Sequence, residues 1–389
     1  MKDLKKREQG AVAQTYARFP VSLVSGALAR CTDDSGKTYI DFTSGIGVNA
    51  LGFCDPGWAR AVAEQAHTLQ HACNLFYTEP MVKLAEALTA RTGFKRVFFA
   101  NSGAEANEGA IKLARKYAFD RRGPGHSTIV TLKNSFHGRT VTTLSATGQD
   151  AFHNHFFPFT EGFAYAPTND LAGTLALLTD EVCALMIELT QGEGGVVPLD
   201  VEYVRALADT CAQRDILLIV DEVQTGIGRT GTLFAYEQYG IMPGVVTSAK
   251  GLGGGLPIGA VLMGEKVQDT LGTGTHGTTF GGNPVCCAGA CAVLDRLDEA
   301  FLADVRRKGA SVRAFLEALP GVRSVAGMGL MLGIELKKNN APAVIRLCIE
   351  RGLLTLSAKH KVRLLPPLNI DDGTLEEGLA ILASAIADA

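Results

Sequence analysis

Short apolar runs that alternate with longer helical patterns constrain the fold of this chain more than any other feature. The runs are almost uniformly apolar and lie at residues 97–99, 128–130, 184–187, 216–220 and 244–247. Uninterrupted apolar strands are typical of a parallel sheet buried on both faces, and the helical segments between them are then crossover connections. The sequence therefore predicts an α/β domain with a large, mostly parallel sheet flanked by helices.

The last hundred residues, roughly, follow a different pattern. Helical segments at 287–318 and 342–351 surround a β-like segment at 322–336. A strand-like run at 361–365 follows, and an amphipathic helix at 374–387 ends the chain. This mixture predicts a smaller α+β domain.

The length of 389 residues exceeds what one hydrophobic core usually supports, so two lobes are expected. We place an N-terminal segment that packs with the small domain at 1–50, the large domain at 51–285 and the small domain at 286–389. The net charge of −3 gives no basic face for nucleic acid, and no apolar run is long enough to span a membrane. Nine cysteines without a C-x-x-C pair, and a charged start without an apolar signal region, predict a cytoplasmic protein.

Polar residues follow several of the predicted strands at the point where each strand ends. Ser102, Glu188, Asp221 and Lys250 all occupy such places. Ligands of open parallel sheets bind at the carboxyl ends of the strands, so these four side chains should converge on one cleft.

Three of these residues could each carry chemistry, although each also has a plain structural explanation. Ser102 could cap a helix whose free N–H groups bind an anion, or only cap it. Asp221 follows five apolar residues and needs a cationic partner, which could be a protonated ring nitrogen or an arginine. Lys250 stands among small residues, where burial would make its amine nucleophilic, although most lysines are solvated surface charges.

Two other patterns point to different classes of protein. The segment 226–231 spells G-x-G-x-x-G, and a nicotinamide-dependent oxidoreductase is the alternative it raises. Such a site also needs a helix that opens at once and an acid about 20 positions on, but 245–251 has no acid, and residues 221–224 separate the glycines from the strand. Glu64, His67 and His71 share a helical face, but no H-E-x-x-H accompanies them, so we expect no metal site.

Taken together, the motifs resemble those of the class III, ornithine/acetylornithine-type aminotransferases, which are pyridoxal 5'-phosphate enzymes of fold type I. The resemblance runs essentially from end to end, with the motifs in the family's order. They are NSGAEANEGA at 101–110, SFHGRT at 135–140, QGEGG at 191–195, DEVQTGIGRTG at 221–231, SAKGLGGGLPIGA at 248–260 and HGTTFGGNP at 276–284.

The resemblance implies a role for each cofactor-binding residue. Lys250 would carry pyridoxal 5'-phosphate as a Schiff base and transfer the proton, and Asp221 would pair with the pyridinium nitrogen, so these two are the expected catalytic residues. The other expected cofactor contacts are Ser102, Gly103 and Ala104 at the phosphate, Phe136 and Val223 on the two ring faces, Gln224 at the phenolic oxygen, Glu222 in the same motif, and Thr279 at the phosphate from a partner subunit.

The same resemblance assigns the substrate contacts. Arg139 would grip a substrate carboxylate, with Thr278 of the partner chain beside it. Arg363 would bind the second carboxylate of an oxo acid, and Glu193 would mask Arg363 when an ω-amine is bound. These roles imply a homodimer with shared active sites.

Within the family, the segments at 15–26 and 74–80 resemble the acetylornithine-type subgroup. That likeness implies a ping-pong transfer of the ω-amino group of N2-acetylornithine to 2-oxoglutarate. The products would be N-acetylglutamate 5-semialdehyde and glutamate, a step of arginine biosynthesis. Ornithine, 4-aminobutyrate and succinyl-diaminopimelate are the alternative donors.

Overall fold

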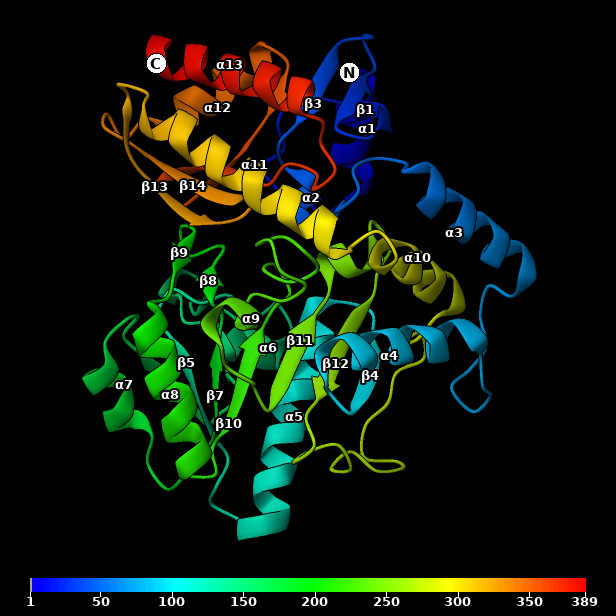
Figure 1. The fold of residues 1–389 in the computed structure, drawn as a ribbon, viewed down its shortest axis with the longest axis vertical. Helices are drawn as coiled ribbons and strands as arrows, with labels where there is room; N and C mark the ends of the chain where they lie inside the picture. Colours follow the sequence, from blue (N-terminus) through cyan, green and yellow to red (C-terminus); the bar gives the residue numbers. More distant parts are fainter. Residues whose placement is uncertain (1) are drawn as a thin grey trace.

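A seven-stranded sheet forms the centre of the larger lobe in the computed structural model, which describes residues 2–389 (Figure 1). In spatial order its strands are β4 (Arg96–Ala100), β12 (Gly259–Met263), β11 (Val245–Ser248), β10 (Leu217–Asp221), β7 (Val182–Ile187), β5 (Thr128–Leu132) and β6 (Phe163–Ala166). Only β12 runs antiparallel to its two neighbours in this sheet. The predicted fold class, a large and mostly parallel sheet in an α/β domain, is confirmed.

Helices cover both faces of this sheet, which explains why its strands are apolar throughout. The helices of the larger lobe are α3 (Pro56–Thr68), α4 (Glu79–Thr92), α5 (Gly103–Arg122), α6 (Val141–Ala146), α7 (Leu171–Leu177), α8 (Val201–Gln213), α9 (Tyr236–Tyr239) and α10 (Pro284–Leu294). On one face, α5 packs its alanines and Ile111 against Ile129, Ile219 and Val245. On the other face, α4 and α8 share a core with Leu185 and Val220. Neighbouring residues of one strand therefore enter two different cores.

The second lobe joins the beginning of the chain to its end, above the sheet in Figure 1. One of its sheets contains β1 (Leu23–Ala27), β2 (Arg30–Asp33), β3 (Thr38–Asp41) and β15 (Leu353–Leu354), and the other contains β13 (Val322–Met328), β14 (Met331–Leu336), β17 (Lys361–Leu364) and β16 (Leu356–Ala358). Its helices are α11 (Glu299–Glu317), α12 (Ala341–Glu350) and α13 (Asp372–Asp388). Phe42 and Tyr39 share a core with Leu332, Leu364 and Leu382, so the two ends of the chain are packed together.

The remaining elements are short. They are α1 (Lys2–Ala11), α2 (Ser44–Gly47), β8 (Thr190–Gln191), β9 (Val197–Pro198) and two turns of 3-10 helix, η1 (Asp150–Phe152) and η2 (Lys250–Gly253). Within residues 2–389, no helix is both long and apolar enough to cross a lipid bilayer.

Two boundaries differ from the sequence expectation. The helix expected at 287–318 is divided into α10 and α11, because Asp298 caps a new helix by accepting a hydrogen bond from the Phe301 N–H at 2.8 Å. The β-like segment at 322–336 is a hairpin in which β13 and β14 run antiparallel.

The G-x-G-x-x-G segment at 226–231 is a loop between the two lobes. The guanidinium of Arg229 is 2% exposed, and its Nη1 donates to the Leu330 and Pro366 carbonyls at 3.1 and 2.5 Å. A Cβ at Gly228 would lie 3.1 Å from Leu368, and the φ of Gly228 is +83°. These glycines therefore serve a turn and close packing between lobes, and no helix opens there to bind a dinucleotide.

Candidate active site

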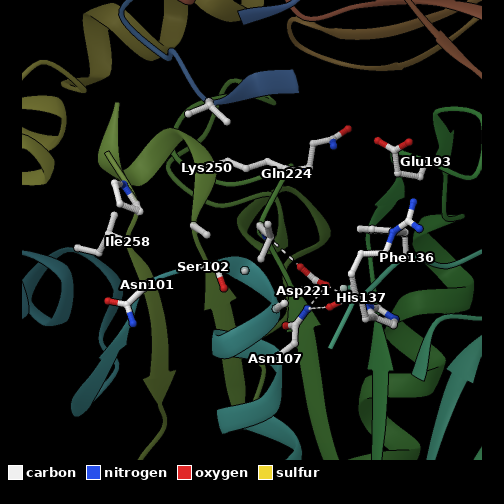
Figure 2. Close-up of a pocket in the computed structure, with 18 of the residues that line it drawn as sticks. Asn101, Ser102, Asn107, Phe136, His137, Glu193, Asp221, Gln224, Lys250 and Ile258 are labelled. Atoms are coloured by element: carbon white, nitrogen blue, oxygen red, sulfur yellow. Dashed lines mark hydrogen bonds and ion pairs between the residues drawn. The ribbon is translucent and has the colours of Figure 1, made fainter. Parts of the chain in front are cut away.

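A cavity of about 460 Å³ opens at the carboxyl ends of the central strands. Its lining brings together residues predicted from widely separated motifs (Figure 2). They are Ser102, Gly103, Ala104, Phe136, Arg139, Glu188, Glu193, Asp221, Val223, Gln224 and Lys250. The convergence of strand ends that the topology predicted is therefore present in the structure.

The start of α5 forms one end of the cavity. The Ser102 hydroxyl accepts a hydrogen bond from the Glu105 N–H at 3.1 Å and caps the helix. The Glu105 carboxylate accepts from the Asn101 N–H at 2.7 Å, which fixes the preceding loop. The first turn of the helix therefore faces the cavity with its N–H groups and positive dipole end, an arrangement that suits a phosphate.

Gly103 in this turn allows a close approach that no other residue could. A Cβ on Gly103 would lie 2.6 Å from Cγ1 of Val223, well inside van der Waals contact. Val223 lines the cavity from the segment after β10. The glycine therefore brings the helix start against an apolar cavity wall.

Asp221 lies at the end of β10 and is held by three donors. Its Oδ1 accepts from the Val223 N–H at 3.0 Å, and its Oδ2 accepts from Nδ2 of Asn107 and from Nδ1 of His137, each at 2.8 Å. Asn107 is fixed in turn, because its Oδ1 accepts from the Thr247 hydroxyl at 2.7 Å. Figure 2 shows Asp221, Asn107 and His137 together at the base of the cavity.

His137 and Glu188 are the titratable neighbours of this carboxylate. Burial alone would lower the pKa of the His137 imidazole, but the hydrogen bond to Asp221 and the charges of Asp221 and Glu188 raise it. Burial raises the pKa of Glu188 to about 7, although the Phe136 and Gly192 N–H groups donate to its carboxylate at 2.9 and 3.4 Å. The site therefore has buried groups that can hold protons near neutral pH.

Lys250 follows β11 and extends its side chain across the cavity (Figure 2). Its backbone is in the left-handed region, with φ at 43°, and its amine has no hydrogen-bond or ion-pair partner among residues 2–389. Burial lowers the pKa of the amine, and the positive charge of Arg363 acts in the same direction, against the carboxylate of Glu193. A lysine with a lowered pKa is a better nucleophile at neutral pH.

Arg363 and Glu193 form a direct ion pair. Nη1 of Arg363 donates to Oε1 of Glu193 at 2.6 Å and to Oε1 of Gln224 at 3.4 Å. The Arg363 side chain is 3% exposed, whereas that of Glu193 is 34% exposed. Arg139 differs, because its guanidinium lies on aromatic rings and is open to solvent.

One predicted cofactor contact must be corrected. The Glu222 carboxylate is fully buried and does not line the cavity; it accepts from the Thr225 hydroxyl and from the Tyr236 N–H at 2.5 and 2.9 Å. Side chains alternate along an extended segment, so Asp221 and Val223 face the cavity while Glu222 faces the opposite side. Glu222 is a structural residue of the large lobe.

Thr278 and Thr279 lie outside the cavity of their own chain. The Thr278 hydroxyl accepts from Nδ2 of Asn101 at 3.1 Å, and Thr279 is exposed. Asn107 and His137 are the reverse case, since they reach the cavity without having been predicted. Both stand inside recognised motifs, but nothing in their local sequence shows that they contact Asp221.

The cavity fits pyridoxal 5'-phosphate by charge and by shape. The α5 N-terminus suits the phosphate, the Asp221 carboxylate suits a protonated ring nitrogen, and the Lys250 amine suits the aldehyde carbon. Val223 and Phe136 supply apolar walls for a flat ring. The donor set therefore agrees with the cofactor that the sequence motifs imply.

Comparison with known proteins gives a consistent result. The family description Aminotransferase class-III matches residues 11–386. The acetylornithine aminotransferase of Haemophilus ducreyi is 54% identical over 99% of this chain and 98% of its own, and that of Caldanaerobacter subterraneus is 46% identical over 98% of each.

Solved structures extend the likeness to the fold. The N-acetylornithine aminotransferase from Stenotrophomonas maltophilia has a TM-score of 0.84 at 40% identity and covers 96% of this chain and 97% of its own. The ornithine aminotransferase from Toxoplasma gondii has a TM-score of 0.95 at 32% identity and covers 100% of this chain and 95% of its own. Sequence and fold are thus similar to these enzymes over almost the whole length.

Proposed function

The chain belongs to the class III aminotransferases, and on that premise we propose that it transfers the ω-amino group of N2-acetylornithine to 2-oxoglutarate. It is a pyridoxal-phosphate-dependent transaminase, with an amino donor and an oxo acid as its two substrates. The names of relatives that are 54% and 46% identical over nearly the full length support this donor. The products would be N-acetylglutamate 5-semialdehyde and glutamate, a step in arginine biosynthesis.

The observation that carries the proposal is one cavity lined by Lys250, Asp221 and Arg139, with Arg363 paired to Glu193 of that lining. The α5 N-terminus at 102–104 would hold the cofactor's phosphate, and Asp221 would hold its ring nitrogen. When bound, the cofactor supplies an electron sink for the negative charge that develops on the substrate carbon. Phe136 and Val223 would enclose the ring, and Gln224 would lie beside its phenolic oxygen.

Lys250 would do the proton transfer. Its Nζ would hold the cofactor and would move a proton away from the substrate carbon that bears the nitrogen. Burial, which lowers the pKa of this amine, keeps a fraction of it unprotonated and able to accept that proton. Asp221, fixed by Asn107 and His137, would hold the opposing positive charge in place.

Arg139 and Arg363 would serve the two substrates differently. N2-acetylornithine has one carboxylate, for which Arg139 is available, since it has no ion-pair partner among residues 2–389. 2-Oxoglutarate has two carboxylates, and its second would displace Glu193 from Arg363. The Glu193–Arg363 pair would then distinguish donor from acceptor within the same cavity.

We further propose a homodimer in which Thr279 of each chain reaches the phosphate site of the other, with Thr278 beside the other's Arg139. Thr279 is exposed in the single chain, and exposed apolar side chains follow it at Phe280 and lie next to Asn74, whose Nδ2 donates to the Thr278 carbonyl at 3.2 Å. Phe280 is 60% exposed, and Leu75 and Tyr77 are 89% and 97% exposed. Sedimentation analysis should give twice the chain mass, and a Thr279→Ala variant should bind the cofactor more weakly; a fully active monomer would contradict this arrangement.

A cytoplasmic location is also proposed. All nine cysteines are free thiols in the structure, including Cys54 and Cys73 on the surface. Free thiols persist in reducing compartments. Activity recovered outside the cytosolic fraction would contradict the proposal.

The donor is tested by a panel of amines with 2-oxoglutarate. N2-acetylornithine should give the highest kcat/KM, above ornithine, 4-aminobutyrate and succinyl-diaminopimelate. Ornithine is the second candidate, because the structure with a TM-score of 0.95 is an ornithine aminotransferase. A preference for ornithine would refute the proposed donor, and a Lys250→Ala variant with normal turnover would refute the mechanism.

A further inference from the structure

Phe152, which ends η1, supports the guanidinium of Arg139. The carbon Cζ of Arg139 lies 4.2 Å from the centre of the Phe152 ring and 5.6 Å from that of Phe136. Arg139 is exposed and makes no hydrogen bond or ion pair with the other residues that the structure describes. The aromatic rings are therefore what determines the direction of this side chain.

The position of Phe152 is itself fixed by the segment that carries Phe136. The Phe152 N–H donates to the Gln149 carbonyl at 3.0 Å, and the Gln149 side chain donates to the Ser135 carbonyl at 3.0 Å. The Gly148 N–H donates to the Ser135 hydroxyl at the same distance. The two rings meet edge to face, with centroids 6.0 Å apart and planes at 70°. Phe152 is therefore a fixed support beside the cavity wall.

The contact leaves the arginine free to bind an anion, since none of its N–H donors is hydrogen-bonded to the residues that the structure describes. Stacking uses the flat face of a guanidinium, whereas its N–H donors point outward in the plane. A carboxylate that binds bidentately needs those in-plane donors. Arg363 contrasts with this, because Glu193 already occupies its Nη1. Arg139 is thus oriented without being occupied, and less rotamer entropy is lost when a carboxylate binds.

We propose that Phe152 is a positioning residue that sets the affinity of Arg139 for the carboxylate of both substrates. The inference rests on the proposed function only in that Arg139 binds a carboxylate. A flat ring is required, because an aliphatic side chain would fill the space without attracting the cation. Phe152 touches neither the lysine nor the acid of the site, so it should affect binding rather than the chemical step.

The test compares Phe152→Leu with Phe152→Tyr in the holoenzyme. For Phe152→Leu, KM for the amino donor and for 2-oxoglutarate should rise roughly two- to fivefold, the size of an exposed cation–π contact. The value of kcat and the visible spectrum of the bound cofactor should stay near those of the wild type. Phe152→Tyr should restore both KM values. If Phe152→Leu folds poorly, Phe152→Met takes its place, and the same rise in KM is expected.

Two controls separate the role of Phe152 from general damage. Phe156→Leu alters an exposed phenylalanine of the same loop that does not contact Arg139, and it should leave KM unchanged. In an Arg139→Ala background, Phe152→Leu should add no further loss, because Phe152 acts through that arginine.

Binding of glutarate, a dicarboxylate without a reactive carbonyl, is measured in parallel by titration calorimetry. Its Kd should rise by the same factor as KM in Phe152→Leu. An unchanged Kd, or an equal loss in the Arg139→Ala background, would overturn the role of Phe152. If the wild type preferred another amino donor, the proposed function would fail. The glutarate Kd values of the wild type, the two single variants and the double variant would still decide whether Phe152 acts through Arg139.

Discussion

Replacing His137 with phenylalanine should weaken the binding of pyridoxal phosphate and reduce the pH dependence of the apoprotein's stability. The imidazole is 1% exposed, and its Nδ1 lies 2.8 Å from Oδ2 of Asp221. Phenylalanine fills the same space, so the change removes a hydrogen bond with little cavity cost. A hydrogen bond to a charged group contributes about 1.5–3 kcal/mol, which corresponds to roughly 10- to 100-fold in an equilibrium constant.

Removing the His137 hydrogen bond weakens the orientation of the Asp221 carboxylate. Without His137, Oδ2 keeps only the amide of Asn107 and Oδ1 the Val223 N–H, so the carboxylate is held less firmly toward the ring nitrogen. Cofactor affinity should therefore decrease by roughly tenfold or more. Absorbance titration of the apoprotein with pyridoxal phosphate measures this directly.

The pH dependence follows from the raised pKa of His137. A group whose pKa is higher in the folded state binds its proton more tightly there. The stability that the protonated imidazole contributes is complete below pH 6.5, its ordinary pKa. It is lost as the pH rises through the higher pKa that His137 has in the folded protein. The wild-type apoprotein should therefore lose stability above that point, and the variant should lack this component.

Urea unfolding of both apoproteins at about pH 6 and about pH 9 measures the difference. His153→Phe is the matched control, since that imidazole bonds the Leu144 carbonyl at 3.0 Å and lies outside the cavity. A His137→Phe variant with wild-type cofactor affinity and an unchanged pH slope would refute the reasoning.

Three further predictions concern neighbouring residues. Burial raises the pKa of Glu222 from its ordinary value of 4.5 to about 7. The stability that the protonated carboxyl contributes is therefore complete below pH 4.5 and is lost as the pH rises through about 7. Glu222→Gln should remove this loss, on the order of 3 kcal/mol, when unfolding free energies at about pH 5 and pH 8 are compared; an unchanged difference would contradict the assignment. Gly103→Ala should cost about 1–3 kcal/mol and weaken cofactor binding, because the new Cβ collides with Val223; a wild-type Tm would argue against that packing. Glu193→Gln should lower KM for 2-oxoglutarate severalfold by freeing Arg363, and a higher KM would show that the glutamate does not mask it.

The buried strands and the cleft at their ends could be predicted because they depend on local patterns. A buried parallel strand is apolar throughout, and the polar residue after it marks the binding edge. The positions of Asp221 and Lys250 follow from this pattern. β12 was not predicted, because its apolar residues adjoin a glycine- and proline-rich motif, and neither was β6.

The contacts between distant segments could not be predicted from local patterns. Asn107 and His137 meet Asp221 only after α5 and the segment beyond β5 have packed on β10. The glycine motif at 226–231 is a different case, since its spacing alone suggests a dinucleotide site, the missing acid argues against one, and its role is packing around Arg229. Glu222 belongs to the same motif as Asp221 and Val223, but side chains alternate along an extended segment, and the motif alone does not show which residues face the cavity.

The most direct test of the account identifies the lysine that carries the cofactor. The purified holoenzyme is reduced with borohydride, digested and examined by mass spectrometry for the phosphopyridoxyl group. The label is expected on Lys250, and no labelled peptide is expected from a Lys250→Ala variant treated in the same way. A label on another lysine of the wild type, or none, would contradict the central claim.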